Sequence, residues 1–298
     1  MSGELLREPF TVLDGGLSTA LEELGERPSG LLWTAAALLD RSDVITAAHC
    51  LYVDAGADLV ITSSYQASEA GFVSAGCTPE QARQLLASTT EVARSSGAEL
   101  VACSVGPFGA CLGDGSEYHG RYAVSWAEVR AFHRERLEVL VPTVPDVFAI
   151  ETMPSRAEAE IVVDELRRLT DAPAWVSFTC ADESHTASGD DIAVAAMAVA
   201  SRVIAVGLNC TAPRLVEPLL RSLRSADLDL PFVVYPNHGA AWDPEHECWL
   251  GPTGGAEIPS LVPSWVDAGA RLIGGCCGVG SAGIRALAEL RAETHRAR

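Results

Sequence analysis

Eight short apolar segments, separated by longer helical patterns, are the feature that most restricts the fold of this chain. They are rich in Val, Ile and Phe and apolar at successive positions, which is typical of strands buried on both faces. The segments lie at residues 10–16, 58–65, 100–108, 147–153, 174–180, 202–210, 232–238 and 272–278. Because eight strand–helix alternations occur within 298 residues, the sequence predicts a closed (β/α)₈ barrel, the TIM-barrel fold, rather than an open sheet.

The segments between the predicted strands carry helix signals. Thr78 and Gln81 have the spacing of a capping box, and Gly97 is a suitable residue to end the helix that they begin. No Pro-rich or Gly/Ser-rich linker divides the chain, so we expect residues 1–298 to form a single domain. The clearest helices are expected at 79–96, 126–141, 155–169, 211–224 and 281–295.

The composition excludes several classes of function. The chain has 40 acidic and 21 basic residues, a net charge of −19, so its surface should repel nucleic acid and anionic membranes. It contains no lysine, which excludes a Schiff base, a lysine-anchored pyridoxal phosphate and a P-loop. It also lacks an uncharged apolar stretch of ~18 residues and a signal-peptide pattern, so no membrane span is expected. With nine cysteines and no secretory signal, the sequence indicates a cytoplasmic protein.

Polar and reactive residues gather where the predicted strands end. In a (β/α)₈ barrel the carboxyl ends of the strands form one face, and that face carries the chemistry. The residues that end strand segments in this way are Asp14, Ser64, Glu151, Cys210, Asn237, Cys276 and Cys277. Two long segments, the glycine-rich 106–125 and 239–256, are expected to be lids or binding loops at the same face.

Three of these residues are cysteines, and they suggest a metal site. Cys276 and Cys277 are adjacent, and a disulfide between neighbours is strained. Cys210 ends the sixth strand segment, and only one strand should separate it from the eighth. The three sulfurs can therefore meet around one ion, and three thiolates with an open fourth position are a catalytic zinc pattern. The alternative is three buried cysteines that only pack in the core.

Three thiolates and Zn²⁺ together carry a net charge of −1, and such a site is a poor Lewis acid for making hydroxide. It is better suited to binding a substrate thiol and keeping it deprotonated as a nucleophile. The site therefore indicates alkyl transfer to sulfur.

Several segments together resemble the homocysteine S-methyltransferase family, from about residue 9 to residue 285. They are LDGGLSTALEELG, GPFGACLGDGSEYHGRY, ETMPSRAEA, VSFTC, GLNCTAP, YPNHG and GGCCG, in this order. The resemblance implies a zinc-dependent (β/α)₈ barrel that methylates homocysteine to methionine. It implies that Cys210, Cys276 and Cys277 bind the zinc ion. The GSEY loop is similar to that of members that use S-methylmethionine or S-adenosylmethionine rather than betaine.

The same resemblance implies roles for other residues. Asp14, Gly15 and Gly16 match a motif that shapes the homocysteine pocket, where backbone N–H groups approach the substrate carboxylate. Glu151 matches the residue that holds the substrate amino group, and Asn237 a polar contact on the donor side. Further donor-side candidates are Tyr118, Asp114, Tyr235 and Trp242.

Two positions depart from the family pattern. His238 stands where members often have Ser. Gly278, Gly280 and Gly283 spell a G-x-G-x-x-G motif, which we interpret as the turn into the last helix because no strand follows it.

The sequence thus predicts that homocysteine binds zinc through its thiol and takes a methyl group from a sulfonium donor by direct displacement. Two alternatives remain open. In the first, the protein methylates another thiol or selenol, such as selenocysteine. In the second, it is a non-catalytic sensor that uses the thiols to respond to zinc or to redox state. The preferred donor and the formation of a homo-oligomer are also left open.

Overall fold

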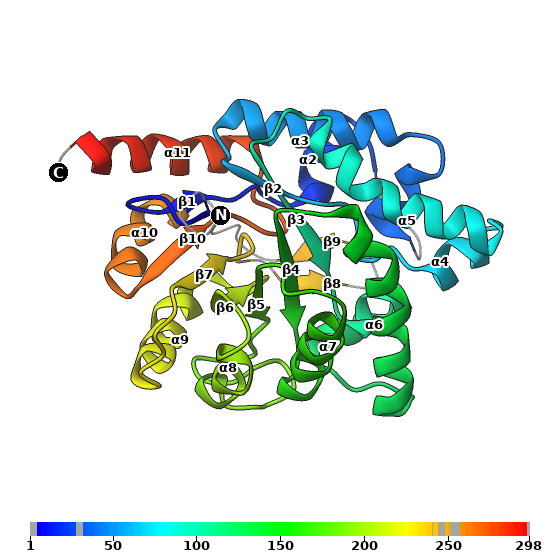
Figure 1. The fold of residues 1–298 in the computed structure, drawn as a ribbon. Helices are drawn as coiled ribbons and strands as arrows, with labels where there is room; N and C mark the ends of the chain where they lie inside the picture. Colours follow the sequence, from blue (N-terminus) through cyan, green and yellow to red (C-terminus); the bar gives the residue numbers. More distant parts are fainter. Residues whose placement is uncertain (1–4, 28–31, 240, 244–247, 251–256, 297–298) are drawn as a thin grey trace.

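Eight parallel strands form the centre of the protein, and helices surround them (Figure 1). The computed structural model describes residues 5–27, 32–239, 241–243, 248–250 and 257–296. In spatial order the strands are β1 (Thr11–Val12), β10 (Ala270–Ile273), β7 (Phe232–Tyr235), β6 (Ala205–Asn209), β5 (Ala174–Phe178), β4 (Val147–Met153), β3 (Leu100–Val105) and β2 (Leu59–Ile61).

The first and last strands of this sheet meet and close it. Leu13, which follows β1, forms a parallel bridge with Leu59 in β2. The N–H of Asp58 donates to the carbonyl of Val12 at 2.8 Å. The predicted (β/α)₈ barrel is therefore confirmed, and each of the eight predicted strand segments overlaps one strand of it.

The helices follow the strands in the expected alternation. The five predicted helices are confirmed, and Thr78 and Gln81 form the expected capping box at the start of α5. The α-helices are α2 (Leu17–Glu23), α3 (Ser42–Ala55), α4 (Glu69–Ser74), α5 (Pro79–Arg94), α6 (Trp126–Leu140), α7 (Arg156–Leu169), α8 (Ile192–Ala200), α9 (Pro213–Ser225), α10 (Ile258–Asp267) and α11 (Ser281–Arg296). None of the helices in the described ranges combines the length and apolar character that a membrane crossing requires.

The strands are apolar on both faces because each face packs against a different core. In β4, Val147 and Ala149 belong to the cluster inside the barrel, whereas Phe148 and Ile150 belong to the larger cluster between strands and helices. Side chains alternate along a strand, so the next residue on the inner face of β4 is Glu151. The inner core thus ends in a carboxylate at the carboxyl end of the strand.

Both long loops contain structure. Residues 106–125 include two short 3₁₀ helices, η2 (Phe108–Leu112) and η3 (Ser116–Tyr118). Within 239–256, β8 (Ala241–Asp243) pairs with β9 (Cys248–Leu250) in an antiparallel hairpin. The rest of this second segment, from residue 240 on, lies outside the described residues, and so does the side chain of Trp242.

Candidate metal and substrate site

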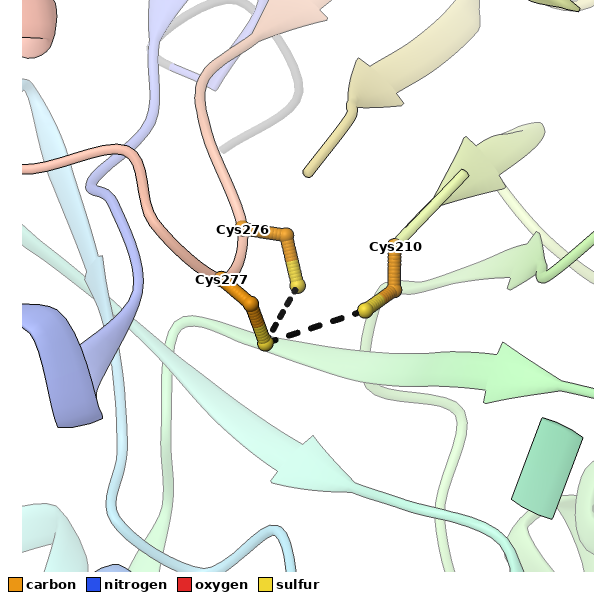
Figure 2. Close-up of side chains that lie close together, drawn as sticks. All are labelled: Cys210, Cys276 and Cys277. Atoms are coloured by element: carbon orange, nitrogen blue, oxygen red, sulfur yellow. Dashed lines mark hydrogen bonds between the residues drawn. The ribbon is translucent and has the colours of Figure 1, made fainter. Parts of the chain in front are cut away.

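The three cysteines meet at the carboxyl ends of the strands. Figure 2 shows Cys210, Cys276 and Cys277 with their sulfurs turned toward one another. The Sγ of Cys277 lies 3.8 Å from that of Cys210 and 3.9 Å from that of Cys276. All three sulfurs lie within 4.8 Å of one another. The prediction that these distant parts of the chain converge is therefore confirmed.

Cys210 reaches the cluster through an unusual backbone conformation. Its φ angle is +47°, in the left-handed region that residues other than Gly rarely adopt. Asn209, the residue before it, faces the barrel interior and accepts hydrogen bonds from the Thr152 N–H at 2.7 Å and the Ser177 hydroxyl at 2.8 Å. Strict alternation would direct Cys210 away from the barrel mouth. The left-handed turn redirects it, and backbone strain of this kind is characteristic of functional sites.

The loop after β7 joins the two parts of the cluster. The Cys276 N–H donates to the Pro236 carbonyl at 2.8 Å, and the His238 N–H donates to the Cys277 carbonyl at 3.0 Å. The side-chain amide of Asn237 donates to the Cys210 carbonyl at 3.3 Å. Residues 236–238 therefore fix all three cysteines through their main chain.

The three thiols have different acidities. Hydrogen bonds from Cys276 and Cys277 hold the pKa of Cys210 well below its usual range. The interaction with Cys210 in turn raises the pKa of Cys276 and of Cys277 well above theirs. One thiolate therefore forms readily, and the next protons leave only when a positive charge compensates them.

The cluster fits a tetrahedral metal ion. Sulfurs ~2.3 Å from such an ion lie ~3.8 Å apart, and two of the three pairs show this spacing. A dication would also supply the positive charge that the two less acidic thiols need. Three protein ligands leave one tetrahedral position for a substrate.

A cavity of about 400 Å³ opens beside the cluster. Among the described residues that line it, the only ionisable side chains besides Tyr and Cys are the carboxyl groups of Asp14, Glu117 and Glu151. No described lining residue is Arg or His, and the chain has no Lys. Such a cavity favours cations.

Glu151 lines this cavity from the end of β4. It is buried and accepts a hydrogen bond from the Ser104 hydroxyl. Burial raises the pKa of Glu151 to about 7, and the nearby charge of Cys210 acts in the same direction. A cationic group bound here would restore the ionised form.

Asp14 lies near Glu151 and is also buried. Its Oδ2 accepts from the Ile61 N–H at 2.8 Å, whereas its Oδ1 has no hydrogen-bond partner among the described residues. Burial raises the pKa of Asp14 well above its usual range, and the charge of Glu151 adds to this. The two carboxyl groups form one acidic side of the cavity.

Gly15 and Gly16 also line the cavity, and both are tightly packed. A Cβ on Gly15 would lie 2.2 Å from the Val279 carbonyl oxygen, and one on Gly16 would lie 2.8 Å from that of Cys276. The Gly16 N–H donates to the Val279 carbonyl at 3.1 Å, so it is already engaged within the protein. These glycines allow the end of β1 to lie against the cysteine loop.

The loop at 106–125 completes the wall of the cavity. Tyr118 lines it, with its hydroxyl 3.6 Å from the Sγ of Cys210. Glu117, Trp33 and Tyr65 line the cavity as well, and the sequence did not predict this. Glu117 lies inside the GSEY motif, so the only signal for it was the glycine-rich loop around it.

Three other predicted residues lie elsewhere. The Ser64 side chain points away from the cavity and donates to the Ser104 carbonyl at 2.7 Å. Asn237 supports Cys210 and does not line the cavity. Asp114 accepts from the Ser116 N–H at 3.0 Å at the loop surface. The G-x-G-x-x-G segment forms the turn into α11, as expected, with Gly278 at φ +77°.

Fold and site together define a class of protein, a (β/α)₈ barrel with a three-cysteine cluster, suited to a metal ion, at the mouth of an acidic cavity. The family model for homocysteine S-methyltransferases matches residues 11–291, and the chain belongs to this family. The resemblance found in the sequence is thereby confirmed.

Three relatives are informative. Homocysteine S-methyltransferase 2 of Zea mays is 40% identical, covering 93% of this chain and 88% of that protein. The selenocysteine Se-methyltransferase of Brassica oleracea var. italica is 37% identical, covering 95% and 90%. The metallated form of the homocysteine methyltransferase MmuM from Escherichia coli matches with a TM-score of 0.83 at 37% identity, covering 95% and 96%. A metal at the cysteine cluster agrees with this last comparison.

Proposed function

We propose that this protein transfers a methyl group from a sulfonium donor, S-methylmethionine or S-adenosylmethionine, to the thiol of homocysteine, and that zinc is its metal. The observation that carries the proposal is the position of the three sulfurs of Cys210, Cys276 and Cys277 beside a cavity with no described basic residue. Soft sulfur ligands favour zinc over hard cations such as Mg²⁺. The relatives named for homocysteine methylation support the choice of acceptor.

The chain's own residues bind the acceptor. When bound, a zinc ion would lower the pKa of the acceptor thiol and keep it as a thiolate in the fourth position. Glu151 and Asp14 face the same cavity and supply negative charge for the ammonium group of homocysteine. The acceptor is then fixed at both ends, so that its sulfur meets the donor in one orientation.

The transfer is a direct displacement. A lone pair of the thiolate sulfur forms the new bond to the methyl carbon, and the electrons of the old carbon–sulfur bond pass to the donor sulfur. The thiol proton leaves when the acceptor binds, so no general base is needed during transfer. Opposite charges cancel in this step, and a cavity that excludes water favours it.

Selenocysteine is a second candidate acceptor. The Brassica selenocysteine Se-methyltransferase is nearly as similar to this chain as the homocysteine enzymes are. A selenolate would occupy the same fourth position and follow the same displacement.

A methyl-transfer assay with a donor and an acceptor panel tests the proposal. Zinc-loaded protein is given homocysteine or selenocysteine with S-methylmethionine, S-adenosylmethionine or betaine. We expect methionine from homocysteine with a sulfonium donor and none from betaine. Cys276→Ser should lose the metal and at least about 100-fold in rate, because serine is a poor ligand for a soft ion.

Cys50→Ser provides the matched control. Cys50 lies in α3, outside the cluster and the cavity, and its substitution should leave metal content and rate unchanged. Full methylation by metal-free Cys276→Ser would contradict the proposal.

A further inference from the structure

Glu117 is a buried carboxylate with one oxygen, Oε2, that has no partner among the described residues. Its side chain lines the cavity and is 9% exposed, and its Oε2 has no hydrogen-bond partner among the described residues. Burial raises the pKa of Glu117 to about 7, and the charges of Cys210 and Asp114 act in the same direction. Buried carboxylates are normally paired, because leaving one unpaired is costly. A ligand that supplies the missing positive charge would explain its position.

No described group of the cavity wall can provide that charge. Arg136, the buried arginine beside this loop, donates to the main-chain carbonyls of Gly106, Ser64 and Tyr65. It does not line the cavity, and neither does any other described Arg or His. When Glu117 is ionised, its counter-charge therefore has to come from outside the described residues.

The structure holds Glu117 in place. Its loop is fastened near both ends by Glu158 of α7, which accepts from the Phe108 N–H and the Tyr122 hydroxyl, each at 2.6 Å. Within the loop, Gly109 packs so closely that a Cβ on it would lie 2.5 Å from the Glu117 nitrogen. The contacts of the loop with Glu158, and its close packing at Gly109, thus hold Glu117 at the cavity wall.

Glu117 is also separate from the carboxylates that serve the acceptor. Asp14 follows β1, Glu151 lies in β4, and the charge of Glu151 helps to raise the pKa of Asp14. Glu117 belongs to η3, where the neighbouring Tyr118 hydroxyl lies 3.6 Å from the Sγ of Cys210. The donor's methyl group has to approach a sulfur bound at this cluster, so a donor beside η3 would be within reach of it.

We propose that Glu117 is the counter-charge that recognises the sulfonium centre of the methyl donor. The inference rests on the proposed function, because it assumes a donor with a positive centre. Homocysteine brings one ammonium group, for which Glu151 and Asp14 suffice. The third carboxylate of the cavity is then left for the donor, which carries an ammonium group as well as the sulfonium. The position of η3 beside the cysteine cluster, where the methyl group is transferred, assigns Glu117 to the sulfonium.

This role makes a specific kinetic prediction. The positive charge on the donor sulfur decreases as the methyl group leaves, so a carboxylate stabilises the bound donor more than the transition state. Glu117→Gln should therefore raise the donor KM about 10- to 100-fold, with kcat unchanged or higher. The KM for homocysteine and the metal content should stay as in the wild type.

The decisive experiment compares two ligands that differ by one charge. S-methylmethionine carries the sulfonium, and 2-amino-5-methylhexanoate replaces S⁺ by CH with the same shape. Their dissociation constants for metal-loaded protein are measured at about pH 8, where the carboxylate is ionised. The wild type should prefer the sulfonium by about 10-fold or more, and Glu117→Gln should lose this preference.

Two variants serve as controls. Asp114→Asn removes one charge from the same loop but keeps an oxygen acceptor for the Ser116 N–H, so it should retain the preference. Glu117→Asp keeps the charge and should retain at least part of it. A wild type that binds both ligands equally, or a Glu117→Gln protein that keeps the preference, would overturn the inference.

Failure of the proposed function has a different signature. If the proposed function is wrong, the wild-type protein will transfer no methyl group from any sulfonium donor, and no variant is needed to see this. The ligand comparison requires binding and no turnover, so it decides the role of Glu117 separately.

Discussion

At the scale of single residues, alternation along the strands explains which predicted site residues reach the cavity. Glu151 continues the inner face of β4 after Val147 and Ala149. Ser63 and Tyr65 line the cavity after β2, whereas Ser64 between them points away. The sequence predicted where the strands end, but it did not predict which side chain at each strand end faces the cavity. For Cys210, alternation alone predicts the wrong side-chain direction, because the left-handed backbone at this residue turns the side chain toward the barrel mouth.

The raised pKa of Glu151 predicts a pH-dependent stability. Burial raises the pKa of this carboxyl from 4.5 to about 7 in the folded protein. Between these values the unfolded chain loses the proton and the folded chain keeps it, so rising pH favours unfolding. Glu151→Gln lacks this effect. Relative to the wild type, the ligand-free variant should gain up to about 3 kcal/mol of unfolding free energy between pH 4.5 and pH 7.

Urea unfolding of both proteins at a series of pH values measures this difference. The difference in unfolding free energy between the variant and the wild type should not change with pH below pH 4.5 or above pH 7. A difference that does not change across this interval would contradict the buried, protonated state assigned to Glu151.

At the scale of elements, the loop at 106–125 depends on a helix that does not line the cavity. Glu158 of α7 is fully buried and binds the loop at Phe108 and Tyr122. The Nε2 of His133 in α6 lies 3.0 Å from the same carboxylate. The length and glycine content of the loop predicted its functional role. They did not reveal this buried anchor, which requires three segments of the chain to meet.

Glu158→Gln should loosen the loop without removing the metal. The neutral amide has one acceptor oxygen in place of two, so one buried donor loses its partner, at a cost of about 1–3 kcal/mol. Hydrogen exchange should increase within residues 108–122, and the donor KM should rise. Glu160→Gln is the matched control, because Glu160 is a half-buried residue of the same helix whose only ion pair among the described residues is with Arg156. Unchanged exchange in Glu158→Gln would argue against the anchor.

At the scale of the whole molecule, the order of strands in the closed barrel creates the site. Only β7 separates β6 from β10, so Cys210 and the Cys276–Cys277 pair lie close in space although Cys276 comes 66 positions after Cys210 in sequence. The number of strands and the position of the cysteines predicted this convergence. Asp14 and Glu151 were predicted at this face. The place of Glu117 and the lack of basic residues among the described lining residues were not predicted, because they depend on how the loops fold over the barrel mouth.

The central claim is that three cysteine sulfurs hold one metal ion and leave a position for the acceptor thiol. X-ray absorption at the metal edge of zinc-loaded protein tests it directly. We expect three sulfur ligands and one lighter ligand at rest, and four sulfur ligands at ~2.3 Å once homocysteine is added. Fewer than three sulfurs at rest, or no additional sulfur on adding homocysteine, would contradict the account.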